Sequence, residues 1–372
     1  MKKHLHIVSF NVPYPADYGG VIDVFYKLES LHKAGVEIIL HCFEYGRPKA
    51  EILESFCKKV YYYKRKSGLK YFISKTPYIV NTRISDILLQ NLANDKFPVL
   101  FEGLHTCGIL NNGLLEDRLK IVRAHNVEHH YYRQLAGIEN KFKERFFFKK
   151  EASKLEKFER ILVMANCVLS ISPNDHTHFN NLYQNSLFVP AFHPNEKVKS
   201  KEGRGNYVLY HGNLSVAENC KAANFLIENV FSKIKGIPVK IAGKNPDKSI
   251  FANASKHLRD YEIIANPSNQ RMSQLIENAQ INVLPTFQST GIKLKLIAAL
   301  FSGRHCIVNH DMVDNTGLES LCSIKDSAQE IAEEIKRLFS ITFTKMQVES
   351  RTEILNSGFL NFQNAAKIVE LL

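Results

Sequence analysis

No apolar run in this sequence approaches the ~20 residues that a helix needs to cross a bilayer. The first residues, MKKHLHIVSF, lead directly into NVPYP. They lack the longer apolar stretch and the small-residue cleavage site of a secretory signal. We therefore expect a first β-strand at this end of the chain and a cytoplasmic protein, with peripheral contact at the inner membrane left open.

The seven cysteines form no CxxC pair, and their number is odd. They are scattered, mostly among apolar neighbours, which is not the pattern of a disulfide framework or of a structural zinc site. The sequence also shows no repeat of short period and no low-complexity tract. We expect reduced, buried thiols inside ordinary globular domains.

Acidic residues are too few to balance the basic ones. The 372 residues include 37 Asp and Glu against 49 Lys and Arg, which gives a formal net charge of +12. Such an excess favours anionic partners, namely nucleotides, membrane surfaces or nucleic acid. Charge alone does not choose among these three.

Short apolar runs alternate with segments of helical periodicity along both halves of the chain. A polar stretch without periodicity, HPNEKVKSKEGRGN, separates the halves and predicts a linker. Strands alternating with helices in each half indicate two doubly wound parallel sheets, an α/β fold class. The predicted strands are 4–11, 36–43, 97–104, 119–126 and 168–171, then 207–210, 239–242, 261–265, 281–285 and 305–308.

The segment 281–309 predicts one complete unit of such a sheet, and we expect the protein to be organised around it. The strand 281–285 ends at a proline, the loop 286–291 is polar, and a helix over 292–301 stops at Ser302-Gly303. The next strand follows directly. The loop therefore lies at the carboxyl edge of the sheet, where open α/β sheets bind their ligands.

Two lysines, Lys293 and Lys295, fall in the predicted first turn of that helix. A cation at a helix N-terminus is disfavoured by roughly 0.3–1 kcal/mol. Free backbone N–H groups beside two ammonium groups are suited to a bound phosphate. The alternative is that both lysines extend from a buried helix to water.

Histidines end two predicted strands, and a polar block follows the second. His105 comes after the strand 97–104, and His125 ends the strand 119–126, so both are expected at the ligand-binding edge. Glu128 and His129 follow closely. A metal site of His125, Glu128 and His129 is an alternative that we weigh and reject, so no metal is expected.

A glycine pair and a basic, aromatic stretch complete the candidate features of the first half. Gly19 and Gly20 lie between the first strand and a helix, a place where backbone approaches a ligand closely. Basic and aromatic residues are most concentrated in the stretch Lys58–Phe72. This stretch fits an anionic membrane surface, stacked nucleic-acid bases, or simply a solvated basic face.

Five blocks of this sequence, taken in order, are similar to those of a known family. PTFQSTGIKLKLIAALFSG resembles the donor-site signature of family 4 glycosyltransferases. The other blocks that resemble this family are RAHNVEHHYYRQLAG, VLSISPNDH, YHGNLSVAENCKAANFLI and VKIAGKNP. The resemblance spans almost the whole chain, and the order of the blocks is its most specific feature.

The resemblance implies the GT-B arrangement, in which two Rossmann-like domains face a cleft. Residues 1–190 would bind the acceptor, 205–345 would bind a nucleotide sugar, and 346–372 would return as a helical segment to the first domain. The implied reaction moves a sugar from a nucleotide-diphosphate-sugar donor to a glycan or lipid-linked acceptor, with retention, in cell-surface polysaccharide or glycoconjugate synthesis. The nucleotide sugar would be a co-substrate, and no cofactor is expected.

The resemblance also assigns roles to particular residues. Catalytic roles fall to Lys293 and Lys295 at the diphosphate and to His105 or His125 near the acceptor. The remaining donor-site residues are Gly212, Asn213, Gly243, Thr290, Gly291, Ile292 and Ala298. The acceptor-site residues are Gly19, Gly20, Asn126, Glu128 and His129. An anionic membrane surface, through Lys58–Phe72, is the further partner, and nucleic acid is not expected.

The donor site departs from the family's pattern. Thr290 and Ala298 stand where the family carries the two glutamates of its E-x7-E pair, which hold the donor ribose. Asn213 and Glu218-Asn219 stand near the places of the usual arginine and lysine. The site is therefore a variant or a weakened one, and a non-catalytic nucleotide- or sugar-binding protein is the alternative function. A nucleotide-sugar 2-epimerase would need carboxylates that the sequence does not place there.

Overall fold

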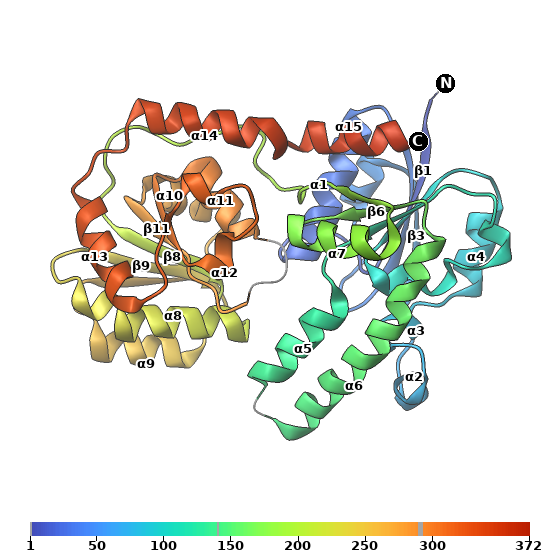
Figure 1. Ribbon diagram of the computed structural model, residues 1–372, viewed down its shortest axis with the longest axis horizontal. Helices are drawn as coiled ribbons and strands as arrows, with labels where there is room; N and C mark the ends of the chain where they lie inside the picture. Colours follow the sequence, from blue (N-terminus) through green and yellow to red (C-terminus); the bar gives the residue numbers. More distant parts are fainter. Residues whose placement is uncertain (1, 140, 289–292) are drawn as a thin grey trace. The chain divides into compact units, whose positions relative to one another are not determined.

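The computed structural model describes residues 2–139, 141–288 and 293–372, and its chain forms two compact units. The first unit comprises 2–194 together with 361–372, and the second comprises the described residues of 195–360. Each is built on its own parallel sheet (Figure 1). The predicted fold class, two doubly wound α/β domains, is confirmed.

The sheet of the first unit has seven parallel strands in the order β3-β2-β1-β4-β5-β6-β7. Its central strands are buried along almost their whole length, because helices cover both faces of a parallel sheet. The strands are β1 (His4–Ser9), β2 (Glu37–Glu44), β3 (Cys57–Lys64), β4 (Val99–Glu102), β5 (Lys120–Ala124), β6 (Cys167–Ser170) and β7 (Ser186–Phe188).

Two apolar clusters fill the two sides of this sheet. One includes Leu5 and Ile7 of β1 with Leu28 and Ile368 from two helices, and the other includes Val8 and Phe101. The alternation along β1, Ile7 to one side and Val8 to the other, follows the period of two of a strand. The helices are α1 (Gly19–Lys33), α2 (Leu69–Ile73), α3 (Tyr78–Asn81), α4 (Asp86–Ala93), α5 (Glu128–Ile138), α6 (Phe142–Phe158), α7 (Pro173–Tyr183) and α15 (Asn361–Leu371).

The second unit has six parallel strands in the order β10-β9-β8-β11-β12-β13. They are β8 (Val208–Asn213), β9 (Val239–Lys244), β10 (Tyr261–Ala265), β11 (Ile281–Val283), β12 (His305–Val308) and β13 (Ser323–Ile324). The helices are α8 (Ala217–Asn229), α9 (Lys248–His257), α10 (Asn269–Asn278), α11 (Leu294–Ser302), α12 (His310–Val313), α13 (Ala328–Phe339) and α14 (Lys345–Gly358).

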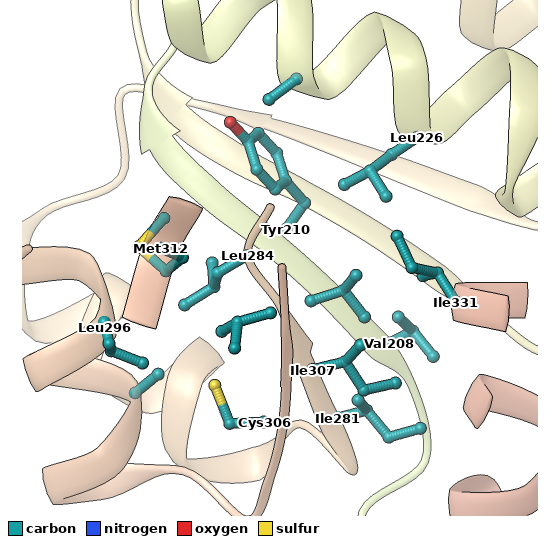
Figure 2. Packing of buried hydrophobic residues seen from close by; sticks show 14 of the residues in the cluster. Val208, Tyr210, Leu226, Ile281, Leu284, Leu296, Cys306, Ile307, Met312 and Ile331 are labelled. Carbon is teal, nitrogen blue, oxygen red and sulfur yellow. The ribbon is translucent and has the colours of Figure 1, made fainter. Parts of the chain in front are cut away.

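The main core of the second unit lies between its central strands and the surrounding helices (Figure 2). Tyr210 from β8, Ile281 from β11 and Ile307 from β12 point into it, where they meet Leu226 of α8. These side chains come from the apolar runs that predicted the strands. The core thus fixes the carboxyl ends of β8 and β11, where the candidate site begins.

The C-terminal segment 346–372 is divided between the two units. In α14, Arg351 donates from Nη1 to the Gly303 carbonyl at 2.6 Å and from Nη2 to the Arg304 carbonyl at 2.7 Å, both in the second unit. In α15, Asn361 exchanges two hydrogen bonds with the backbone of His193 in the first unit. Among the described residues, no helix is long and apolar enough to span a membrane.

Candidate functional site

The carboxyl edge of the second sheet brings two predicted glycines together. Gly212 lies near the end of β8 and Gly243 near the end of β9, in the paired register of the two strands. A Cβ atom on Gly243 would lie 1.9 Å from the Gly212 carbonyl oxygen, so only glycine fits there. This contact lets the two strand ends approach closely at the predicted site.

Lys295 is a part-buried cation of this edge. It lies in the first turn of α11, and its Nζ donates to Oδ1 of Asn219 on α8 at 3.0 Å. Asn219 in turn donates from Nδ2 to the Asn213 carbonyl at 3.0 Å, so the amide joins the lysine to the end of β8. Burial lowers the pKa of Lys295 to about 8, although the nearby charge of Glu218 acts against that shift. The ammonium therefore has a neutral amide, rather than a carboxylate, as its hydrogen-bond partner.

Lys293 precedes α11 instead of lying in its first turn. Its backbone angles, φ −89° and ψ 44°, are not helical, so the helix begins at Leu294 and the predicted start at residue 292 is too early. Its Nζ donates to the Gln288 carbonyl at 2.8 Å. The predicted diphosphate-binding residues Thr290, Gly291 and Ile292 lie outside the residues that the structure describes.

Thr286, the first residue of the predicted loop, makes contacts at this edge that the sequence did not predict. The Thr286 backbone exchanges hydrogen bonds of 2.9 and 2.6 Å with the Asn309 side chain, which follows β12. The Thr286 hydroxyl donates to the Glu218 carboxylate. Polar residues directly after β11 and β12 were the available signal, because parallel strands end at the same edge.

Ala298 lies one turn beyond Lys295 on α11. It is part-buried and packs against the cluster that contains Leu209, Leu275 and Ile276. His211, the residue before Gly212, is also buried here, and burial together with the charge of Lys295 lowers its pKa to about 3. It is therefore neutral beside the lysine.

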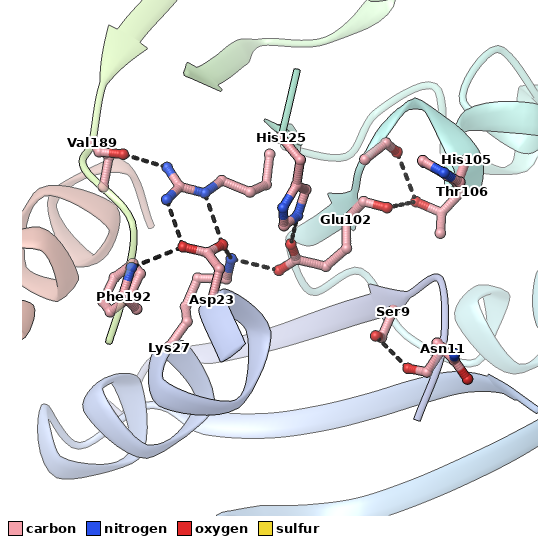
Figure 3. A network of polar contacts seen from close by, with 12 residues as sticks. Ser9, Asn11, Asp23, Lys27, Glu102, His105, Thr106, His125, Val189 and Phe192 are labelled. Atoms are coloured by element: carbon pink, nitrogen blue, oxygen red, sulfur yellow. Dashed lines mark hydrogen bonds and ion pairs between the residues drawn. The ribbon is translucent and has the colours of Figure 1, made fainter. Parts of the chain in front are cut away.

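The first unit holds a fully buried ion network at the carboxyl edge of its sheet (Figure 3). Lys27 of α1 lies 2.9 Å from Asp23 and 2.8 Å from Glu102 at the end of β4. Arg123 of β5 donates to both Asp23 oxygens, at 2.8 and 3.1 Å. Burial alone raises the pKa of Asp23, but the charges of Arg123 and Lys27 outweigh it and hold that pKa well below its usual range.

His125 is part of this network, since its Nε2 lies 3.0 Å from the second Glu102 oxygen. Asp23, Glu102 and His125 offer atoms within 4.8 Å of one another, which is the spacing of a metal site. However, the ammonium of Lys27 already lies between the two carboxylates. The group is therefore a charge-balanced ion network, and it anchors His125.

The residues of the rejected metal hypothesis have separate partners. His129 Nδ1 lies 3.1 Å from the Glu159 carboxylate, whereas His125 contacts Glu102. Glu128 faces a third group, His105, with 3.9 Å between Oε1 and Nδ1. The three residues thus do not converge on one point, and among the described residues only the ion network above has the spacing of a metal site.

Glu128 and His105 form a pair of groups in the first unit whose pKa values are both shifted by burial. Burial raises the pKa of the Glu128 carboxyl to about 7, although a hydrogen bond from Asn126 acts against that shift. Burial also holds the pKa of His105 well below its usual value, so its imidazole is neutral. A Cβ on Gly103 would lie 2.8 Å from His105 Nδ1, so a glycine there makes room for the ring. Such a carboxyl exchanges protons near neutral pH.

The predicted glycine pair starts α1. A Cβ on Gly20 would lie 2.7 Å from the Phe10 ring, and that ring packs against both His105 and His125, at 5.3 and 5.4 Å between ring centroids. The structure therefore gathers Gly20 and both histidines around Phe10, just after β1, and Gly19 is the first residue of α1. Asn126, which directly follows the β5 region, joins them through Glu128.

The aromatic residues of the stretch Lys58–Phe72 are largely used in packing. Tyr63 is buried, and its hydroxyl contacts His41 at 2.8 Å and accepts from Asn91 at 2.9 Å. Phe72 of α2 stacks on Phe147 of α6 with 5.2 Å between ring centroids. Leu69 of this stretch is 71% exposed, and Ile73, the residue after the stretch, is 66% exposed.

Sequence reasoning missed the buried ion network. Its signals were present: Asp23 and Lys27 are four residues apart on one helix, and Glu102 is the single charge in the apolar segment FPVLFEGL. Arg123 lies 100 residues from Asp23, so no local pattern joins them.

Comparison with solved structures shows which class of fold the two units form. The chain has the fold of GT-B glycosyltransferases. A glycosyltransferase from Rickettsia africae ESF-5 is 14% identical, with a TM-score of 0.66, and the match covers 100% of this chain and 97% of that one. TarM is 11% identical with a TM-score of 0.69, covering 100% and 99%. WaaG, a glycosyltransferase involved in lipopolysaccharide biosynthesis, is 12% identical with a TM-score of 0.62, covering 98% and 99%.

Residues 205–340, within the second unit, match the family model described as "Glycosyl transferases group 1". A relative from Klebsiella pneumoniae, an "Uncharacterized 44.6 kDa protein in cps region", is 27% identical over 312 residues, which are 79% of each chain. The predicted resemblance is thus confirmed at the level of the group, and the narrower assignment to family 4 stays a prediction.

Proposed function

We propose that the protein transfers a sugar from a nucleotide-diphosphate-sugar donor, held by the second unit, to a glycan or lipid-linked acceptor held by the first. The single observation that carries this proposal is Lys295, a part-buried ammonium hydrogen-bonded to a neutral amide beside Gly212. A cation that is partly withdrawn from water and lacks a carboxylate as its hydrogen-bond partner is costly, and a bound diphosphate would compensate its charge. The setting of the Klebsiella pneumoniae relative, a cps region, supports a role in polysaccharide synthesis.

In this proposal the acceptor hydroxyl attacks the anomeric carbon while the bond to the diphosphate breaks. Lys295 and Lys293 stabilise the negative charge that develops on the leaving diphosphate. These ammonium groups take the place that a divalent metal has in other phosphate chemistry, so we propose that no metal cofactor is needed. Removal of metals with a chelator should then leave turnover unchanged.

The acceptor proton has two routes, and each belongs to one stereochemical outcome. In an inverting reaction it passes to the Glu128 carboxylate, whose raised pKa suits a base near neutral pH. In a retaining reaction, which the family 4 resemblance implies, it passes to an oxygen of the leaving phosphate. His105, neutral and next to Glu128, would orient the carboxyl in the first case.

Replacement of Lys295 tests the donor site. Lys295→Met should weaken binding of a nucleoside diphosphate by about 1.5–3 kcal/mol, the value of a charged hydrogen bond. It should also raise stability at neutral pH, because the folded chain no longer buries a charge whose pKa is depressed. Binding is measured by calorimetry and stability by thermal unfolding, and Lys256→Met, at an exposed lysine of α9, is the matched control.

A screen of nucleotide sugars against the wild type decides between enzyme and binding protein. Thermal shift identifies the donor, since a ligand at 100 times its Kd stabilises by about 2.7 kcal/mol. Slow hydrolysis of that donor, accelerated by an acceptor, supports transfer. Tight binding with no hydrolysis and no transfer favours the non-catalytic alternative, which is motivated by Ala298 in place of a ribose-binding glutamate. If no nucleotide sugar binds at millimolar concentration, the donor proposal is wrong.

We propose in addition that the protein acts in the cytoplasm, at the inner face of a membrane where a lipid-linked acceptor would lie. The exposed side chains of Leu69 and Ile73, close in sequence to Lys66, Lys70 and Lys75, support this location.

A further inference from the structure

Two arginines lie at the carboxyl edge of the first sheet, near the proposed acceptor residues. Arg65 directly follows β3, Tyr45 follows β2, and Phe10 follows β1, three neighbouring strands whose ends share one edge. Arg83, which follows α3, reaches the same edge, since its Nε donates to the Phe10 carbonyl at 2.9 Å. The two guanidinium groups are close enough for the charge of Arg65 to lower the pKa of Arg83.

Neither arginine forms an ion pair with a carboxylate of the described chain. Arg83 donates from Nη1 to the Ile79 carbonyl at 2.6 Å, and Arg65 donates from Nε to the Thr82 hydroxyl at 3.0 Å. Nη2 of Arg83 and both Nη atoms of Arg65 have no acceptor among the described residues. Arg65 instead contacts two tyrosine rings, with its guanidinium carbon 4.1 Å from the Tyr45 ring centroid and 5.5 Å from that of Tyr78.

Without a ligand, the proximity of Arg65 and Arg83 lowers the stability of the folded chain. Arg83 is only 6% exposed, and burial, together with the charge of Arg65, lowers its pKa to about 9. The charge of Arg83 acts on the carboxyl group of Glu128. Burial raises the pKa of that carboxyl to about 7, so at neutral pH Glu128 supplies only part of a negative charge. Two guanidinium groups that repel each other in this way are stabilised by an anion between them.

The carbonyl contacts of Arg83 show that it also has a structural role, because they tie α3 to the end of β1. That role accounts for Nε and Nη1 of Arg83. It leaves Nη2 of Arg83 without an acceptor, and the contacts of Arg65 with Thr82, Tyr45 and Tyr78 likewise leave both of its Nη atoms without one among the described residues. Guanidinium forks bind the paired oxygens of carboxylates and phosphates.

We propose that Arg65 and Arg83 together bind an oxyanion carried by the acceptor, either a phosphate ester or a sugar carboxylate. The inference rests on the proposed function, since it takes this edge as the acceptor site. It narrows that function to acceptors with an anionic group close to the hydroxyl that is glycosylated. Tyr18 and Tyr132, whose phenols lie within the electrostatic reach of Arg83, would line the same site.

The test titrates the full-length protein with glycerol phosphate and, separately, with glucuronate at fixed ionic strength, and follows binding by calorimetry. Arg65→Gln should weaken binding of the preferred anion at least tenfold. Lys64→Gln removes the same charge from the exposed neighbouring residue and should leave the affinity unchanged. Arg83→Lys keeps the charge but loses the fork, and it should weaken binding even where the fold is intact.

Stronger binding of glycerol phosphate assigns a phosphate-bearing acceptor, and stronger binding of glucuronate assigns an acid sugar. If neither anion binds the wild type, or if Arg65→Gln binds as well as Lys64→Gln, the proposal is wrong. Nucleotide binding is measured on the same samples. Loss of anion binding with intact nucleotide binding separates this site from the donor site, and a wild type that binds no nucleotide contradicts the proposed function without deciding the anion site.

Discussion

Three ionisable groups at the two sheet edges lie in surroundings that disfavour their charged form. Lys295 has a neutral amide as its hydrogen-bond partner, Glu128 is buried with a pKa raised to about 7, and Arg83 is buried with a pKa lowered to about 9. Each costs stability in the folded chain, because burial disfavours the charged form. Such groups concentrate at functional sites, where a substrate or a proton transfer gives them a use.

The raised pKa of Glu128 predicts a pH dependence of stability with a definite sign. The unfolded carboxyl ionises around its ordinary value of 4.5, whereas the folded one keeps its proton up to about pH 7. Between these values the unfolded state gains favourable charge that the folded state lacks, so stability falls as pH rises. The loss is complete above about pH 7, and its size is on the order of 3 kcal/mol.

Glu128→Gln should remove this dependence, because glutamine resembles the protonated carboxyl at every pH. We expect the variant to match the wild type near pH 4.5 and to be more stable than it at pH 8, in urea unfolding followed at both values. His105 adds an opposing rise of stability in this window, because its unfolded imidazole loses its proton around pH 6.5 whereas the folded one is already neutral. This contribution is present in the wild type and in the variant, so it cancels when the two are compared. A variant less stable than the wild type at pH 8 would show that the ionised Glu128 has a partner that stabilises it.

At the scale of elements, the sequence predicted the strands, and the site residues at their carboxyl ends, better than any other feature. Each strand expected from an apolar run exists, including β12, whose residues His305–Val308 are the ones predicted. Three of the four edge strands, β3, β7 and β13, were not among the predicted strands. β7 and β13 are only three and two residues long, too short to give a strand pattern. Lys295, Gly212 and Gly243 were predicted at one edge, and the structure brings them there.

Long-range partners were not predictable from local patterns. The neutral partner of Lys295, Asn219, lies 76 residues away, and Arg123 binds Asp23 across 100 residues. The same limit applies to Arg83, whose acceptor Phe10 lies 73 residues earlier. A periodicity gives the face on which a residue lies, but only the sheet order decides which faces meet.

The hypothesis that the protein binds an anionic membrane surface depends on helix α2. It lies against α6, since Lys154 donates to the Phe72 carbonyl at 2.8 Å and Phe72 stacks on Phe147 (Figure 1). Leu69 and Ile73 are left exposed. On α6 itself Phe142 and Phe146 are exposed as well, at 71% and 62%. Apolar side chains flanked by lysines bind anionic bilayers through both burial and charge.

Leu69→Asp combined with Ile73→Asp should abolish sedimentation of the protein with vesicles that contain anionic lipid at low salt. The wild type should be released as salt rises, since exposed charges are screened over about 10 Å at 0.1 M. Leu114→Asp, at a similarly exposed leucine of the first unit, is the control and should still bind. If neutral vesicles bind equally, charge has no part, and tighter binding to single-stranded nucleic acid would contradict the membrane hypothesis.

At the scale of the whole molecule, the hydrophobic clusters of the two units have no buried side chain in common among the described residues. The clusters of the first unit include Ile368 of α15, and those of the second include Leu355 of α14. Consecutive helices of the last segment thus complete different cores, with only Phe359 and Leu360 between them. We therefore expect the two units to differ in stability and to respond separately to mutation.

Ile368→Ala and Leu355→Ala are a matched pair for this expectation, since both side chains are fully buried aliphatics. Each should destabilise its own unit by about 2–5 kcal/mol through the cavity that it leaves. Hydrogen exchange should speed up in β1 and β5 for Ile368→Ala, and in β8 and β12 for Leu355→Ala, with little change in the other unit. A nucleoside diphosphate should then restore protection in the second unit of Leu355→Ala and leave the first unit of Ile368→Ala unchanged, because its proposed site lies wholly on the second sheet edge. Equal acceleration of exchange in both units by either variant would mean that the two cores unfold as one, and the donor site would then depend on α15 as much as on α14.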